Sequence, residues 1–381
     1  MLGLSGCHVF RKRESLLSST APDGPFDSDE IIVQRLLEVV NEGRRVATYK
    51  LALLLALLDW VMTNSPGDEI PTSDLAKIVF HLYFRQVDEF PRENEGLVTL
   101  RQSSQSKKSI IDSVRDFRAT NPNVRRANLA RFADPEGYER SIVKIEATLV
   151  NQPIPRLQTV GKVQIPFLYD WTWPPEKFPK ALLEKGVARL TLHRGIRHRL
   201  VTLGPLVRPF IEQAWVSDVA RWSRIDTEQE RLRAHLFGAD RTPFPVALRN
   251  ELSAIQQGRC FYCAKPLVPG FPIDHFISWS RYPNDSIENL VASCRQCNLA
   301  KSDRLASRRF VARWVERFLD PRLVAAADSC GWDSNPLGSR SVAANTYGGL
   351  VPGAALWDGG QTSQIVSMPD VAFFESMFRE D

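Results

Sequence analysis

Two Cys-x-x-Cys pairs constrain the fold of this chain more than any other feature. Cys260 pairs with Cys263, and Cys294 pairs with Cys297. Each such turn supplies two thiolates at the separation of one edge of a tetrahedral zinc site, so the two turns supply all four ligands. Four thiolates leave no open coordination position, and we therefore expect a structural Zn²⁺. The alternative is two unrelated pairs of free thiols.

The segment between the two pairs carries polar residues at the end of an expected strand. The run PIDHFI alternates apolar and polar residues, and Asp274 and His275 lie where that strand should end. A turn-forming stretch then leads to Asn289. Asn298 follows the fourth cysteine directly, and Lys301 comes three residues later, so the two share one face of the next helical turn.

The pattern C-x2-C, DH, EN-L and C-x2-C-N-x2-K resembles the HNH endonuclease family, whose catalytic unit is the ββα-metal fold. The resemblance covers about residues 245–305 and implies hydrolysis of DNA phosphodiester bonds. It implies that His275 is the general base, its ring fixed by a backbone carbonyl. Asp274 and Asn298 would bind one Mg²⁺ or Mn²⁺, because oxygen ligands suit these hard cations better than zinc.

The resemblance also assigns supporting residues. Asn289 would tie the loop to the strand and so orient His275, a role that we favour over direct metal contact. Lys301 is a candidate for contact with phosphate or with the transition state, and a solvated lysine is the alternative. Further candidates for nucleic-acid contact, for which a solvated surface is the alternative, are Arg281, Arg295, Arg304, Arg309 and Arg313.

The length and composition indicate a globular α+β protein of several domains. At 381 residues the chain has room for two or three domains of roughly 150 residues each. We expect a mainly helical N-terminal region, a mixed middle region and a C-terminal ββα-metal domain. The expected segments are a flexible arm (1–26), a helical domain (27–135), a mixed α/β region for DNA contact or regulation (136–245), the HNH domain (246–320) and a loop-rich extension with a hairpin near Leu356 (321–381).

Other sequence features bear on partners and location. The net charge of +5 is compatible with a polyanionic partner without identifying one. The N-terminal stretch lacks the apolar core of a secretion signal, and the longest apolar run is interrupted by Lys50 and Asp59. We therefore expect a cytoplasmic protein without membrane contact. His81 lies in an apolar helical context, which predicts a core histidine.

Three functional hypotheses follow. A metal-dependent DNA endonuclease uses the cysteines together with Asp274, His275 and Asn298, and all three are intact. A zinc-stapled nucleic-acid-binding module without cleavage needs only the cysteines. An RNA-cleaving enzyme is the third, because the motif does not distinguish the sugars. Helical regions joined to such a centre are typical of bacterial restriction or anti-phage proteins, so a homodimer or a partner protein in a defence system is also considered.

Overall fold

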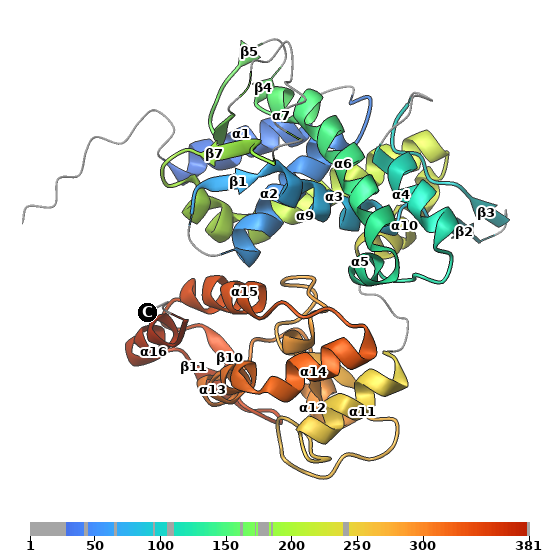
Figure 1. Cartoon of the computed structure of the whole chain (residues 1–381). Coiled ribbons are helices and arrows are strands. Elements are labelled where there is room, and N and C mark those ends of the chain that lie inside the picture. Colours follow the sequence, from blue (N-terminus) through green and yellow to red (C-terminus); the bar gives the residue numbers. More distant parts are fainter. Residues whose placement is uncertain are drawn as a thin grey trace, which may run out of the picture.

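The computed structural model divides into an N-terminal lobe, residues 28–238, and a C-terminal lobe, residues 244–378 (Figure 1). The expected α+β class is confirmed, since helices alternate with strands that form only small sheets. The predicted arm, residues 1–26, lies outside the described part of the chain. The described residues are 28–41, 45–64, 67–93, 96–104, 110–160, 163–171, 173, 183, 186–238 and 244–378.

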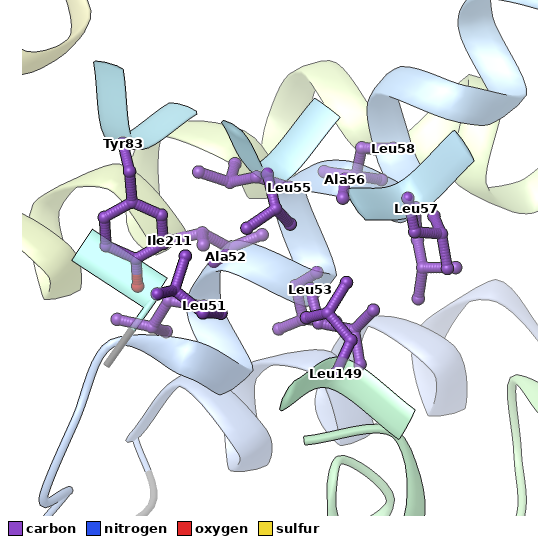
Figure 2. Packing of buried hydrophobic residues seen from close by; sticks show 14 of the residues in the cluster. Leu51, Ala52, Leu53, Leu55, Ala56, Leu57, Leu58, Tyr83, Leu149 and Ile211 are labelled. Carbon is purple, nitrogen blue, oxygen red and sulfur yellow. The ribbon is translucent and has the colours of Figure 1, made fainter. Parts of the chain in front are cut away.

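The N-terminal lobe is built around helix α2 (Tyr49–Thr63). Its sequence is apolar on almost every side, which is typical of a helix enclosed by protein. It packs against α3 (Thr72–Phe84) and the long α9 (Ile196–Ser223). Figure 2 shows the leucines of α2 between Tyr83 of α3, Leu149 and Ile211 of α9. Among the described helices, none is both long and apolar enough to cross a membrane.

Further helices and three small sheets complete this lobe. The helices are α1 (Asp29–Asn41), α4 (Ile110–Thr120), α5 (Ala130–Ala133), α6 (Pro135–Asn151), α7 (Pro153–Arg156) and α10 (Gln229–Phe237). One antiparallel sheet has the order β1 (Glu69–Pro71), β7 (Arg189–Leu192), β6 (Tyr169–Trp171). Two-stranded sheets join β2 (Phe90–Arg92) to β3 (Gly96–Val98) and β4 (Thr159–Val160) to β5 (Val163–Gln164).

The structure does not separate the two N-terminal segments that the sequence suggested. Leu149 of α6 and Ile211 of α9 belong to the same hydrophobic core as Leu55 of α2. The expected boundary near residue 135 therefore runs through one core. Helical patterns show which face of each helix is apolar, but not which faces meet.

The C-terminal lobe continues from α11 (Val246–Ile255) into a strand-strand-helix unit. Strand β8 (Ile273–His275) pairs antiparallel with β9 (Leu290–Ala292), and α12 (Arg295–Lys301) follows. Around this unit lie α13 (Arg308–Glu316), α14 (Pro321–Cys330), α15 (Pro336–Gly348), β10 (Ala355–Trp357), β11 (Ser363–Ile365) and α16 (Met368–Phe378).

The segment after residue 320 differs from the loop-rich extension that we expected. It contains α14, α15 and α16, and the expected hairpin at Leu356 is confirmed by the pairing of β10 with β11. The signal for two of these helices was present in the sequence. Asp320 and Asn335 each precede a proline at the first helical position, and each side chain accepts a hydrogen bond from a first-turn N–H.

The two lobes are joined by polar contacts as well as by packing. Asn345 of α15 donates hydrogen bonds to the carbonyls of Val61 (3.2 Å) and Met62 (3.1 Å) near the C-terminal end of α2. These carbonyls are among those that a helix end leaves without an intrahelical partner. The C-terminal lobe thus completes the central helix of the N-terminal lobe.

A cavity of about 350 Å³ lies at the junction of the lobes. Its lining includes Arg126 and Arg208 from the N-terminal lobe and Trp279 and Asp285 from the C-terminal lobe. His81 also lines this cavity and is exposed, so our expectation of a core histidine is wrong. The apolar neighbours of His81 in sequence occupy the opposite face of α3, which faces the core.

Replacement of Leu55 by alanine should lower the free energy of unfolding by about 2–5 kcal/mol, because the fully buried side chain would leave a cavity. Leu206 of α9, which is 66% exposed, provides a matched control. We expect its replacement by alanine to change stability by less than ~0.5 kcal/mol. Urea unfolding of both variants checks the difference, and equal losses would contradict the assigned core.

Candidate functional site

The strand-strand-helix unit positions every group of the candidate site. In the pairing of β8 with β9, Asp274 lies opposite Val291 and His275 opposite Leu290. Cys294 is the N-cap of α12, and its Sγ accepts a hydrogen bond from the Cys297 amide at 3.5 Å. The pairing with β9 thus fixes the position of Asp274 and His275 at the end of β8, and Cys294 begins α12 two residues after β9 ends.

The four paired cysteines come together in one cluster. Their Sγ atoms all lie within 4.8 Å of one another, and those of Cys263 and Cys294 are 3.8 Å apart. A tetrahedral Zn²⁺ with Zn–S bonds of about 2.3 Å places its sulfurs roughly 3.8 Å apart. Burial raises the pKa values of Cys260 and Cys297, whereas hydrogen bonds, led by that from the Cys297 amide, lower the pKa of Cys294 despite its burial. A cation among the sulfurs would stabilise the thiolate form of all four. The cluster is compatible with a structural zinc.

Asp274 is buried and held on one side by two donors. Its Oδ2 accepts a hydrogen bond from the Tyr262 hydroxyl at 2.5 Å and lies 3.2 Å from the Lys301 ammonium. Burial, together with the nearby Asp274 carboxylate, raises the pKa of Tyr262 well above its usual value. The phenol therefore stays protonated and donates. The second carboxylate oxygen has no hydrogen bond within the described residues.

Lys301 differs from both sequence-based expectations for it. Its side chain is fully buried, and its Nζ donates to the backbone carbonyl of His275 at 2.9 Å while contacting Asp274. It is neither a solvated lysine nor turned outward toward a phosphate. Because the cysteine cluster anchors the start of α12, the last turn of this helix faces the end of β8. The ammonium therefore ties α12 to the strand that carries Asp274 and His275.

The His275 ring is partly exposed, with 18% of its side-chain surface accessible. Its Nε2 lies 2.8 Å from Oδ1 of Asp285, and the ring is flanked by Phe244 and Trp279, with centroids 5.9 and 5.4 Å away. The family resemblance implied a backbone carbonyl as the partner of the ring. The structure instead provides a carboxylate, and the sequence offered no signal for this beyond the position of Asp285 in a turn-forming stretch.

Asn289 lies 1% exposed beneath the loop that follows β8. Its Oδ1 accepts from the amide of Ile277 at 2.8 Å, while its Nδ2 donates to the carbonyls of Ile277 (3.0 Å) and Asn284 (2.9 Å). All three contacts are to backbone groups. They hold the segment from Ile277 to Asn289 as a closed loop.

Asn298 lies on α12 one turn before Lys301 and is partly exposed. Within the described residues, its side-chain amide makes no hydrogen bond. Asn298 and Lys301, three residues apart, lie on the same face of α12, and Lys301 contacts Asp274. Its amide oxygen is available to an added ligand.

The five arginine candidates occupy different surroundings. Arg313 donates to the carbonyl of Phe261 at 2.7 Å, and Arg309 contacts Asp358 at 2.8 Å, so both are engaged within the protein. Arg281 and Arg304 donate to nearby backbone carbonyls. Arg295 is exposed on the first turn of α12, and its side chain makes no hydrogen bond to the described residues. Of the five, Arg295 retains the most freedom to contact a polyanion.

A model of the HNH endonuclease family matches residues 260–304. The matched segment contains the four clustered cysteines, β8, β9 and α12. The expected HNH domain in the C-terminal region is therefore confirmed. Comparison with curated proteins and comparison with solved structures returned no match.

Replacement of Cys260 by serine should reduce bound zinc from about one ion per chain to near zero, because three thiolates hold Zn²⁺ less tightly than four. Metal analysis of the purified protein by mass spectrometry checks this. Cys330 lies outside the cluster, so Cys330→Ser is the control and should retain the metal. Wild-type protein that folds without zinc would contradict the assignment.

Proposed function

We propose that this chain, which carries an HNH domain, is a metal-dependent endonuclease that hydrolyses phosphodiester bonds in DNA. The observation that carries the proposal is that α12, with Asn298 one turn before Lys301, is tied through Lys301 to the end of β8, which carries Asp274 and His275. Lys301 links this end directly, because its ammonium contacts both the Asp274 carboxylate and the His275 carbonyl. Members of the HNH family are generally nucleases, which supports this assignment.

Oxygen ligands at this end suit a divalent cation such as Mg²⁺ or Mn²⁺. Tyr262 and Lys301 occupy one oxygen of Asp274 and leave the other available, and the amide oxygen of Asn298 has no partner within the described chain. Hard cations prefer such carboxylate and amide oxygens. When bound, the ion would stabilise the negative charge that develops on the leaving oxygen. The cysteine cluster is a separate site, closed by its four sulfurs.

His275 would act as the general base that takes a proton from the attacking water. Its ring is partly exposed and held by a carboxylate, so it is both accessible and oriented. Asn289 supports this arrangement, because its three backbone hydrogen bonds set the path of the chain directly after His275. Arg295 would contact the nucleic-acid backbone near the start of α12.

A binding module without cleavage is the alternative. Such a module requires the cysteine cluster, but it does not require a buried carboxylate tied to a lysine and a tyrosine beside an accessible histidine. An RNA substrate is equally compatible with the groups described here. A role in restriction or anti-phage defence, and a homodimer or a partner protein within it, rests on analogy with other HNH proteins that carry a large helical region.

His275→Ala should lower cleavage of plasmid DNA in the presence of Mg²⁺ or Mn²⁺ by about 10²–10⁴-fold, which is the usual contribution of general-base catalysis. Asn298→Ala should lower it as well and raise the metal concentration needed for half-maximal rate. The assay follows conversion of supercoiled plasmid to nicked and linear forms. Modified DNA, unmodified DNA and RNA of matched length serve as parallel substrates.

The control for these variants is His198→Ala, because His198 is exposed on α9 in the other lobe. It should cleave like the wild type. Zinc content and thermal unfolding of each variant show whether the fold is retained. Undiminished cleavage by folded His275→Ala would show that His275 is not the general base. Cleavage of RNA but not of DNA would show that the substrate is RNA.

A further inference from the structure

Asp285 connects the candidate base to the other lobe. One of its carboxylate oxygens lies 2.8 Å from Nε2 of His275, and the other lies 2.7 Å from Nη1 of Arg126. Arg126 belongs to the N-terminal lobe, in the segment between α4 and α5. Residues far apart in the sequence therefore form one continuous chain of polar contacts at the junction of the lobes.

The contact with Asp285 determines which ring nitrogen of His275 carries a proton. An ionised carboxylate only accepts hydrogen bonds, so Nε2 must be the protonated nitrogen. Nδ1 then keeps its lone pair, and within the described residues it has no hydrogen-bond partner. The nitrogen left free is the one that can receive a proton from water. A different tautomer would present an N–H at that position instead.

Asp285 is itself held from several directions. Its backbone carbonyl accepts a hydrogen bond from the Trp332 indole N–H at 2.7 Å. The Arg126 guanidinium lies over the rings of Phe244 (5.0 Å) and Trp332 (5.2 Å) and is only 7% exposed. A guanidinium enclosed in this way forms a directional, well-ordered pair with a carboxylate. Arg126 thus reduces the freedom of the carboxylate that orients His275.

We propose that Asp285 is a positioning residue for His275, and that Arg126 positions Asp285, so that docking of the N-terminal lobe completes the nuclease site. The inference rests on the proposed role of His275 as the base. It gives the N-terminal lobe a part in catalysis, because Arg126 lies outside the HNH segment and contacts Asp285 within it. The simpler explanation is an ion pair that only fastens the two lobes together.

A second ion pair crosses the same junction and serves as a comparison, although the side chain of its arginine is 50% exposed and that of Arg126 only 6%. Arg131 of the N-terminal lobe forms an ion pair with Asp333 of the C-terminal lobe at 2.7 Å, the same distance as the Arg126–Asp285 pair. Within the described residues, the Asp333 carboxylate bonds Arg131 and Ser286 and makes no hydrogen bond to the His275 ring, whose carboxylate partner is Asp285. Loss of Arg131 therefore weakens the junction without removing either contact of the Asp285 carboxylate.

The kinetic test compares Asp285→Asn, Arg126→Gln and Arg131→Gln. We expect Asp285→Asn and Arg126→Gln to lower kcat by roughly 10–100-fold, the usual effect of losing a group that orients a functional side chain, with little change in KM for DNA. Arg131→Gln should retain the wild-type kcat. The double variant of Asp285 and Arg126 should lose less than the product of the two single losses, because both act through the same contact. Asp285→Glu should recover part of kcat.

A spectroscopic test does not depend on cleavage. Long-range ¹⁵N correlation spectra of protein labelled at its six histidines distinguish the two neutral tautomers, and the His275 signal is the one lost in His275→Gln. At alkaline pH, His275 should be present with its proton on Nε2. In Asp285→Asn and Arg126→Gln the signal should shift toward a mixture of tautomers, while the His275 signal of Arg131→Gln stays unchanged.

The outcomes separate this inference from the proposed function. Wild-type protein that cleaves no nucleic acid would overturn the nuclease proposal, and the spectra would still decide whether Asp285 and Arg126 set the tautomer. An unchanged His275 signal in folded Asp285→Asn would overturn the positioning role. Equal losses of kcat in Arg126→Gln and Arg131→Gln would show that the ion pair only joins the lobes.

Discussion

The four-cysteine cluster is the constraint on which the candidate site depends. The strands β8 and β9 contain three residues each, and α12 contains seven. A two-stranded hairpin and a helix of two turns are each marginal in water, so local hydrogen bonds alone do not hold them together. The cysteines link the segment before β8 to the first turn of α12. The cluster, together with the packing of Phe276 and Val291 in the core of this lobe, therefore sets the positions of the groups on these elements.

Besides the cluster, buried polar contacts of Lys301 determine how α12 lies against β8. Lys301 has no exposed surface, and its charge is compensated by Asp274 and by the carbonyl of His275. A buried ammonium is unfavourable unless such partners are present. The same contacts that make Lys301 tolerable in the interior therefore fix the distance between α12 and the end of β8. The Lys301 side chain therefore both holds α12 against β8 and contacts the Asp274 carboxylate of the candidate site.

Much of the site could be predicted from the sequence, because its ligands are close together along the chain. The spacing of the cysteines, the Asp274-His275 pair and Asn298 directly after Cys297 all lie within residues 260–304, the segment that the family model matches. Helices α14 and α15 could also have been predicted from the proline that follows each capping residue. The expectations of an outward-facing Lys301 and a core His81 were wrong, because both concern the surroundings of a side chain. Whether a polar side chain faces the interior, a cavity or solvent depends on the element packed against it.

The sequence by itself determined the α+β class, the cysteine ligands and the residues that mark an HNH domain. These features depend on residue types at short spacings along the chain, where the local backbone geometry determines how close the side chains lie to one another. Only the tertiary structure decided that buried residues from Ile32 to Leu236, within the described part of the chain, share one core and that Lys301 is buried. It also decided that Arg126 reaches Asp285 beside His275. Such contacts join segments far apart in the chain, and their partners follow from how whole hydrophobic faces pack, which no local pattern encodes.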